Sequence, residues 1–317
     1  MSQPPKRTPA AARPQATRTP PRPATPRPAA NAAKGAASAR ARLAAEQARQ
    51  ERRRRQRMLV IIPLAVVLVA VAALVVVRLT GLGSSTSPTA SGVTDSGVIA
   101  GVTSVPATVL DQVGTGTMKT PPKAGGGAAL TADGKPKILY VGAEYCPYCA
   151  AERWPMVVAL SRFGTFTGLG QTASSSTDVY PSTPTLTFHG SSYTSKTIAF
   201  TGVEAESNER SGSGYATLDT PTAEDEQTFS TLSGGSYPFV DIAGTYLISG
   251  ASYDPQVLAG KTHAQVAAAL SDPSSDIAKA VDGTANAITA AICASTDNKP
   301  SNVCTSAGVL AAAKTLS

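Results

Sequence analysis

Cys146 and Cys149 are the side chains in this chain whose type and spacing point most clearly to chemistry. In a Cys-x-x-Cys pair at the start of a helix, unpaired backbone N–H groups and the positive end of the helix dipole stabilise the first thiol as an anion. The pKa of that thiol falls from about 8.5 towards about 3.5–7.5, and the second thiol, one turn along, can attack a mixed disulfide. The spacing therefore predicts thiol–disulfide exchange, with Cys146 as the nucleophile and Cys149 as the resolving thiol.

The residues on either side of the pair predict the elements that position it. Lys137 to Ala143 is a nearly continuous apolar run, as expected for a strand buried on both faces of a mostly parallel sheet. Apolar side chains recur at helical spacing from Ala150 to Phe163, where Pro155 should kink the helix and Gly164 should end it. Pro147 suits the first turn of that helix, where no N–H is needed. The pair is thus expected at a strand-to-helix turn.

The four cysteines of the chain also allow other arrangements. The pair could be an inert structural disulfide, or half of a zinc site completed by Cys293 and Cys304. Ten residues separate these two, whereas paired zinc ligands are about two to four apart, and no histidine is nearby in the sequence. The strand–turn–helix setting favours the redox interpretation, which needs no cofactor and no metal.

Cys293 and Cys304 fall in or near two predicted C-terminal helices, with Pro300 as a break between them. We expect a structural disulfide that clips these helices together, rather than a redox relay. In the loop-entropy model, a closure of this size stabilises the fold by about 3 kcal/mol.

A membrane anchor is predicted upstream. Met58 to Val77 is an uncharged run of twenty residues, long enough as a helix to span a hydrocarbon core of about 30 Å. We assign a transmembrane helix to residues 58–78. A buried globular helix and a cleaved signal peptide are the alternatives, but the run is long for a signal peptide and no convincing small-x-small cleavage site follows it.

The flanks of this run predict its orientation. Five arginines lie within residues 52–57, and Arg78 follows the run directly. The positive-inside rule therefore places the N-terminus in the cytoplasm and the residues after the helix outside, in a single-pass protein of the cell membrane.

Charge is divided unevenly along the chain. Residues 1–57 hold fifteen Lys and Arg against two acidic residues and almost no large apolar side chain, which predicts a disordered basic cytoplasmic tail. The rest of the chain holds thirteen basic against nineteen acidic residues. We expect the tail to lie against anionic lipid rather than nucleic acid, and the outer part to bind no nucleic acid.

Composition divides the outer part into a Gly/Ser/Thr-rich linker at 79–97 and a domain at 98–317. Further elements are predicted as follows: a short strand or helix within 98–113, two mutually antiparallel strands at 185–188 and 197–200, a helix at 222–232, a hairpin of strands 239–242 and 245–249, and helices at 254–270, 274–293 and 303–316.

The run Ile138 to Cys149, Ile-Leu-Tyr-Val-Gly-Ala-Glu-Tyr-Cys-Pro-Tyr-Cys, resembles the active-site strand and turn of thioredoxin-fold proteins, and its last four residues are glutaredoxin-like. Extended to Trp154 and joined with Ala159 to Gly164, it is similar to a family of prokaryotic membrane-anchored proteins, the domain of unknown function 929, over about residues 95–315. The resemblance implies an α/β, thioredoxin-like fold. Its mixed sheet would be flanked by helices, with a β insertion at 170–214 and extra C-terminal helices.

Thioredoxin-fold proteins place a cis-proline beside the cysteine pair, just before a core strand. Pro238, ahead of Phe239 to Ile242, matches that position. A cis bond there would bring the backbone of Tyr237 alongside the cysteines, ready to pair with the extended chain of a substrate. An ordinary trans proline at a strand start is the alternative.

One position departs from the thioredoxin pattern. Thioredoxins carry a buried carboxylate six residues before the first cysteine, where this chain has Tyr140. Proton transfer during exchange would then depend on Glu144, on Glu152 or on solvent.

Two functions follow as hypotheses. The first is a membrane-tethered, extracytoplasmic thiol–disulfide oxidoreductase whose partners are exported proteins with cysteine thiols or a membrane redox protein. The second is a non-enzymatic envelope binding or scaffold domain, in which both cysteine pairs are structural and the β insertion provides the binding surface. The motif alone does not fix the direction of exchange, which depends on the relative stability of the thiol and disulfide forms.

Overall fold

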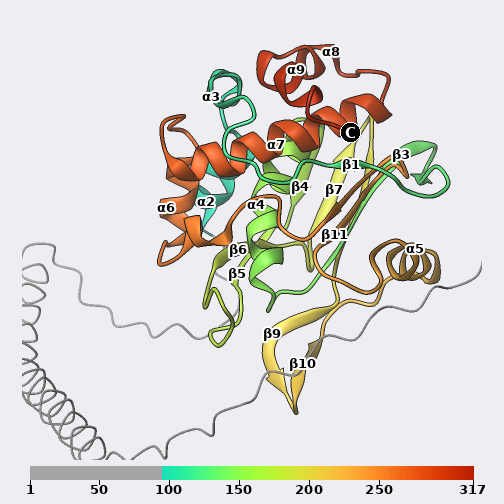
Figure 1. Ribbon diagram of the computed structural model, residues 1–317. Coiled ribbons are helices and arrows are strands. Elements are labelled where there is room, and N and C mark those ends of the chain that lie inside the picture. Colours follow the sequence, from blue (N-terminus) through green and yellow to red (C-terminus); the bar gives the residue numbers. More distant parts are fainter. Residues whose placement is uncertain (1–94) are drawn as a thin grey trace, which may run out of the picture. The chain divides into compact units, whose positions relative to one another are not determined.

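The computed structural model describes residues 95–317 (Figure 1). The predicted tail, the predicted transmembrane helix and nearly all of the predicted linker lie outside the described residues. Within residues 95–317, no helix is both long and apolar enough to cross a membrane.

The central strand of the main sheet is β3 (Lys135–Gly142), the apolar run before the cysteine pair. On one side it pairs in parallel with β8 (Ala199–Glu204), and on the other it pairs antiparallel with β11 (Phe239–Ile242). Strand β12 (Tyr246–Ser249) pairs antiparallel with β11 and completes the predicted hairpin. Two short strands extend the sheet at its edges: β1 (Lys123–Ala124) and β2 (Thr131–Ala132). The sheet is therefore mixed.

Helices cover both faces of this sheet because successive side chains of β3 point to opposite sides. Ile138 belongs to the larger core, which packs beneath α4 (Pro147–Ser161) and α7 (Asp276–Ser295). Leu139 belongs to a smaller core beneath α5 (Ala223–Ser233). Figure 1 shows α5 on one side of the sheet, with α4 and α7 on the other. The fold is α/β, with a mixed sheet flanked by helices.

The pairing predicted for the strands at 185–188 and 197–200 is wrong. Strand β6 (Pro184–Thr187) pairs with β5 (Gly170–Ala173), whereas the second segment begins β8 and joins the central sheet. Alternating side chains indicate strands but do not identify their partners. Strand β8 pairs with β3 over its whole length, from Lys137 opposite Ala199 to Gly142 opposite Glu204.

Two further two-stranded ribbons lie between α4 and α5 in the sequence. They are formed by β4 (Gly164–Thr167) with β7 (Ser192–Ser195), and by β9 (Glu206–Ser211) with β10 (Gly214–Thr217). The β9–β10 hairpin projects from the rest of the domain in Figure 1.

The segment at 98–113 is helical, and the three predicted C-terminal helical stretches form helices. The remaining elements are α2 (Ser96–Thr103), α3 (Ala107–Val113), the short 3-10 helix η1 (Pro255–Leu258), α6 (His263–Ala269), α8 (Ser301–Cys304) and α9 (Ala307–Ala313). A disulfide between Cys293 of α7 and Cys304 of α8 joins two of them, with Cα atoms 5.6 Å apart. This is the structural bridge that the spacing predicted.

Candidate functional site

The Cys146 sulfur caps the N-terminus of α4. After β3 ends, the chain turns, and the Cys146 N–H donates to the carbonyl of Ala143 at 3.2 Å. Cys146 has extended backbone angles, and its Sγ accepts a hydrogen bond from the N–H of Cys149 at 3.3 Å. Pro147 occupies the first turn, where its missing N–H costs nothing. The sulfur therefore takes the place that a serine or aspartate oxygen usually fills at a helix N-cap.

The two thiols of the pair are free and differ in burial and in pKa. Cys146 keeps 7% of its surface exposed, whereas Cys149 is fully buried. A hydrogen bond from the Cys149 thiol, helped by backbone N–H groups and the charge of Arg153, lowers the pKa of Cys146 to about 7 against the opposing effect of burial. Burial raises the pKa of Cys149 well above its usual value. Near neutral pH, Cys146 is thus partly thiolate while Cys149 keeps its proton.

A buried ion pair that the sequence analysis missed lies beneath the cysteine pair. Arg153 of α4 and Glu204 at the end of β8 are both fully buried, and two hydrogen bonds join them, from Nε at 2.7 Å and from Nη2 at 2.6 Å. The Arg153 Nη2 also donates to the carbonyl of Ala143 at 2.7 Å. An arginine seven residues after Cys146, within a mostly apolar helix, was the available signal.

Tyr140, six residues before Cys146, lies next to this ion pair. Its ring centroid is 5.9 Å from the guanidinium carbon of Arg153, and it meets the ring of Phe188 edge to face at 5.0 Å. Its buried hydroxyl makes no hydrogen bond to any of the described residues. Burial raises its pKa well above the usual value, so Tyr140 stays neutral. The group beneath the pair is therefore an arginine–glutamate pair beside a neutral phenol, not a lone acid.

The two acids expected to move protons have different surroundings. Glu144 lies in the turn before Cys146, is 8% exposed, and its N–H donates to the carbonyl of Glu206 in β9 at 2.8 Å. Glu152 is fully buried in α4, and its carboxylate accepts hydrogen bonds from the N–H and hydroxyl of Ser252 at 2.8 and 3.1 Å. Burial raises the pKa of Glu152 to about 7. Of the two, Glu144 is the one adjacent to the pair in the turn.

Tyr237 and Pro238 lie beside the cysteines, at the start of β11. The Tyr237–Pro238 peptide bond is cis, and the Pro238 carbonyl accepts a hydrogen bond from the N–H of Gly250 at 2.9 Å. The Tyr237 side chain packs against the small cluster formed by Ala143 and the two cysteines. The structure therefore brings this predicted segment to the pair.

Aromatic side chains from the β insertion surround the turn that carries the pair. Tyr145 stacks on Tyr215 of β10, with parallel rings and centroids 4.1 Å apart. Tyr148, inside the Cys-x-x-Cys motif, is 41% exposed and meets Tyr180 edge to face. Arg210 of β9 lies over the ring of Tyr215 at 4.4 Å. The sequence carries no local signal for these contacts because they depend on how the insertion folds back.

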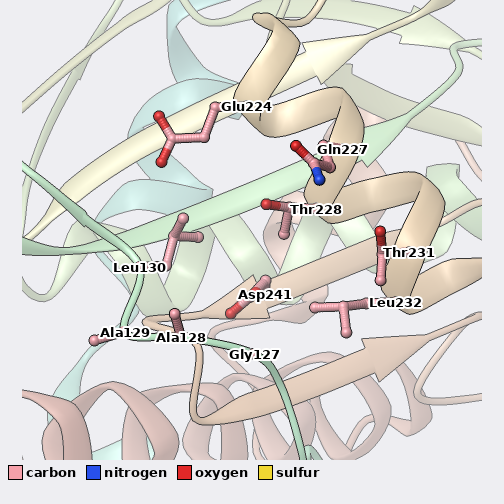
Figure 2. A pocket seen from close by; sticks show the side chains of 10 residues that line it. All are labelled: Gly127, Ala128, Ala129, Leu130, Glu224, Gln227, Thr228, Thr231, Leu232 and Asp241. Carbon is pink, nitrogen blue, oxygen red and sulfur yellow. The ribbon is translucent and has the colours of Figure 1, made fainter.

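A separate pocket of about 260 Å³ lies on the α5 face of the sheet (Figure 2). Figure 2 shows Gln227, Thr228 and Thr231 of α5 on one side of it, Leu130 on the other and Asp241 of β11 between them. Asp241 accepts a hydrogen bond from the N–H of Gly244 at 2.6 Å. This pocket lies on the opposite face of the sheet from α4. Among the described residues, no group of three or more His, Cys, Asp or Glu side chains could hold a metal ion.

Comparisons with known proteins place the chain in a family. Neither the curated proteins nor the solved structures contain a match to it. The family model described as Domain of unknown function (DUF929) matches residues 126–217 and 215–294, which together make up more than half of the chain. The matched residues include β3, the cysteine pair, the Arg153–Glu204 ion pair and Pro238. The chain belongs to the DUF929 family.

Proposed function

We propose that this protein is a membrane-tethered, extracytoplasmic thiol–disulfide oxidoreductase with a thioredoxin-like domain. The observation that carries the proposal is the asymmetry of the pair. Cys146 caps a helix, has a lowered pKa and keeps 7% of its surface exposed, whereas Cys149 lies one turn behind it, fully buried. A nucleophile of lowered pKa that keeps some exposure and a resolving thiol behind it are the two parts that exchange needs.

The strand order supports the thioredoxin-like assignment. The four main strands lie in the order β8, β3, β11, β12, and only β11 runs antiparallel to the other three. Helix α4 follows β3, helix α5 precedes β11, and the cysteine pair begins α4. A mixed sheet flanked by helices, with the cysteine pair at a strand-to-helix turn, supports the fold that the resemblance of residues 138–149 implies.

The proposed reaction is a reversible exchange of one disulfide, and its steps run in either direction. In the oxidised protein, a substrate thiolate attacks the sulfur of Cys146, forming a mixed disulfide and releasing Cys149, which takes up a proton because its pKa is raised. The second thiol of the substrate loses its proton and attacks the substrate sulfur of the mixed disulfide, which breaks its bond to Cys146 and releases the Cys146 thiolate. The substrate leaves as a disulfide, and both cysteines are reduced.

The proposed location rests on the sequence. The uncharged run at 58–77 and the arginines before it support a single membrane helix with the described domain outside. An extracytoplasmic location suits a chain whose Cys293–Cys304 pair is a disulfide, because such bonds persist in oxidising compartments.

The test is exchange between the full chain, purified in detergent, and a peptide that carries two thiols. We expect the oxidised protein to convert the peptide to its disulfide and to end as the dithiol, whereas the Cys146→Ser variant does neither. A wild-type protein whose rate equals that of the Cys146→Ser variant would overturn the proposal.

The aromatic surface favours a second candidate function, a binding or scaffold domain. The stacked Tyr145–Tyr215 pair and Arg210 tie the projecting β9–β10 hairpin to the cysteine turn. If this surface binds a partner without exchange, a chain with Cys146 and Cys149 both changed to Ser will retain the cellular function. A chain that lacks residues 206–217 will lose it.

A further inference from the structure

We propose that the buried Arg153–Glu204 ion pair sets the direction of exchange, making the oxidised cysteine pair a disulfide donor to the dithiols of protein substrates. Arg153 is here a positioning residue: it acts on the reacting sulfur through the turn that carries it. The inference rests on the proposed function and adds its direction.

The position of Arg153 follows from the geometry of α4. It comes four residues after Cys149 and seven after Cys146, so the three side chains lie along one face of the helix. The carbonyl of Ala143 links them, because it accepts both the N–H of Cys146 and the Nη2 of Arg153, at 3.2 and 2.7 Å. The guanidinium is therefore bonded to the same peptide group that holds the nucleophile.

The guanidinium also has hydrogen-bonding capacity that its partners leave unused. Its Nη1 is buried and makes no hydrogen bond within residues 95–317. Buried polar groups in folded proteins are almost always hydrogen-bonded, so an unpaired donor on a fully buried cation calls for a reason. Stabilisation of a Cys146 thiolate is such a reason, because charges interact strongly where water is excluded. Cys146 belongs to the adjacent cluster of Ala143 and the two cysteines.

Apart from Arg210, which lies over the Tyr215 ring in the β9–β10 hairpin, the other titratable groups near the pair are acids or phenols. Glu144 is the acid in the turn before Cys146. Tyr140 of β3, Tyr145 of the turn and Tyr237 before β11 are neutral, because burial raises the pKa of each. Glu206 of β9 contributes negative charge, and Glu204 is bound to Arg153. None of these groups favours a thiolate, whereas the charge of Arg153 lowers the pKa of Cys146 and opposes the rise for Cys149.

The direction follows from the charge of the two redox states. The disulfide form of the pair carries no charge on sulfur, whereas the reduced form carries a Cys146 thiolate. A nearby cation therefore stabilises the reduced form alone, and a pair with a stable reduced form is a strong oxidant. In one exchange the substrate dithiol loses two electrons and two protons, and the cysteine pair gains two electrons and becomes the Cys149 thiol and the Cys146 thiolate or thiol.

The experiment compares three variants of the full chain in detergent. Arg153→Met with Glu204→Gln removes both charges and keeps the side-chain volumes. Glu204→Gln alone removes the anion and leaves the cation uncompensated. Lys137→Met with Asp225→Asn is the matched control, because it removes another buried ion pair, between β3 and α5 on the opposite face. For each protein we measure the equilibrium constant with glutathione and the pH at which Cys146 alkylation is half-maximal.

Opposite shifts are expected from the first two variants. Removing both charges raises the pKa of Cys146 by about one unit and shifts the equilibrium towards the disulfide form, by about tenfold or ~30 mV at a pH well above that pKa. Glu204→Gln alone lowers that pKa and shifts the equilibrium towards the dithiol form. The control leaves both quantities at their wild-type values.

If the ion pair had only a structural role, the equilibrium constant with glutathione would shift in the same direction in the first two variants. That result overturns the inference. So does an unchanged equilibrium constant in both. If the Arg153→Met/Glu204→Gln variant does not fold, Glu204→Gln alone still decides. A shift of its equilibrium constant towards the disulfide form would overturn the inference. Failure of the proposed function looks different: the wild-type protein itself would then show no exchange with glutathione.

Discussion

The two cysteine pairs of this chain consist of the same residues in opposite settings. Cys146 begins helix α4, where backbone N–H groups point at its sulfur, and its partner is a free thiol one turn away. Cys293 lies in the last turn of helix α7 and forms a disulfide with Cys304. A helix N-terminus stabilises a thiolate, whereas the last turn of a helix offers only carbonyl groups, which disfavour one. The end of the helix, more than the residue type, separates a reactive sulfur from a structural one.

The largest expected effect comes from Cys149→Ser, which separates the two steps of exchange. We expect the reduced variant to attack a disulfide-linked peptide dimer through Cys146, releasing one peptide as a thiolate and keeping the other as a mixed disulfide that it cannot resolve. Turnover then falls to the level of Cys146→Ser while this covalent adduct accumulates. Non-reducing electrophoresis and mass measurement detect the adduct. Adducts formed equally well by the Cys146→Ser/Cys149→Ser protein would contradict the assignment.

The matching change in the other pair should affect stability and leave chemistry intact. Replacing Cys293 and Cys304 by Ser is expected to lower the free energy of unfolding by about 3 kcal/mol, because the closed loop no longer restricts the unfolded chain. Denaturant unfolding measures this loss. The rate of exchange at the first pair should stay at its wild-type value, and a parallel loss of exchange would show that the two pairs are coupled.

Helix α7 contributes a third, smaller effect through Asp282. Both carboxylate oxygens of this residue are buried without a hydrogen-bond partner among the described residues, and burial raises its pKa to about 8. The folded state therefore binds a proton more tightly than the unfolded chain, so stability falls as pH rises from about 4 towards 8. The slope from this one group is ~1.4 kcal/mol per pH unit.

Asp282→Asn removes that titration and should flatten the fall in stability between pH 6 and pH 8. Glu152 titrates in the same direction, with a pKa of about 7, so part of the slope should persist. Unfolding free energies measured at four or more pH values give the slope for the wild type and for the variant. An equal slope in wild type and variant would mean that Asp282 is ionised in the folded protein.

How far the sequence predicts this molecule depends on the range of each contact. The strand, turn and helix around Cys146 depend on residues close together in the sequence. The spacing of their apolar side chains and the positions of proline and glycine are sufficient to predict them. The hairpin from Phe239 to Ser249 is predictable for the same reason. In contrast, the alternation at 197–200 indicates a strand without showing that it pairs with β3, some sixty residues away.

The site divides in the same way. The cysteines and the segment at Tyr237 and Pro238 follow from a motif and a resemblance. The Arg153–Glu204 pair does not, because its members are fifty-one residues apart and meet only once β8 is placed beside β3. A charged residue within an apolar helix signals a buried partner, but the sequence alone does not identify that partner.

The most direct test of the central claim is the pH dependence of Cys146 alkylation by iodoacetamide in the reduced, full-length protein. The helix N-terminus and the hydrogen bonds to its sulfur predict a half-maximal rate at a pH of about 7. The unfolded chain, measured in denaturant, should titrate near the ordinary thiol value of about 8.5. A folded protein that titrates at the same pH as the unfolded chain would contradict the account.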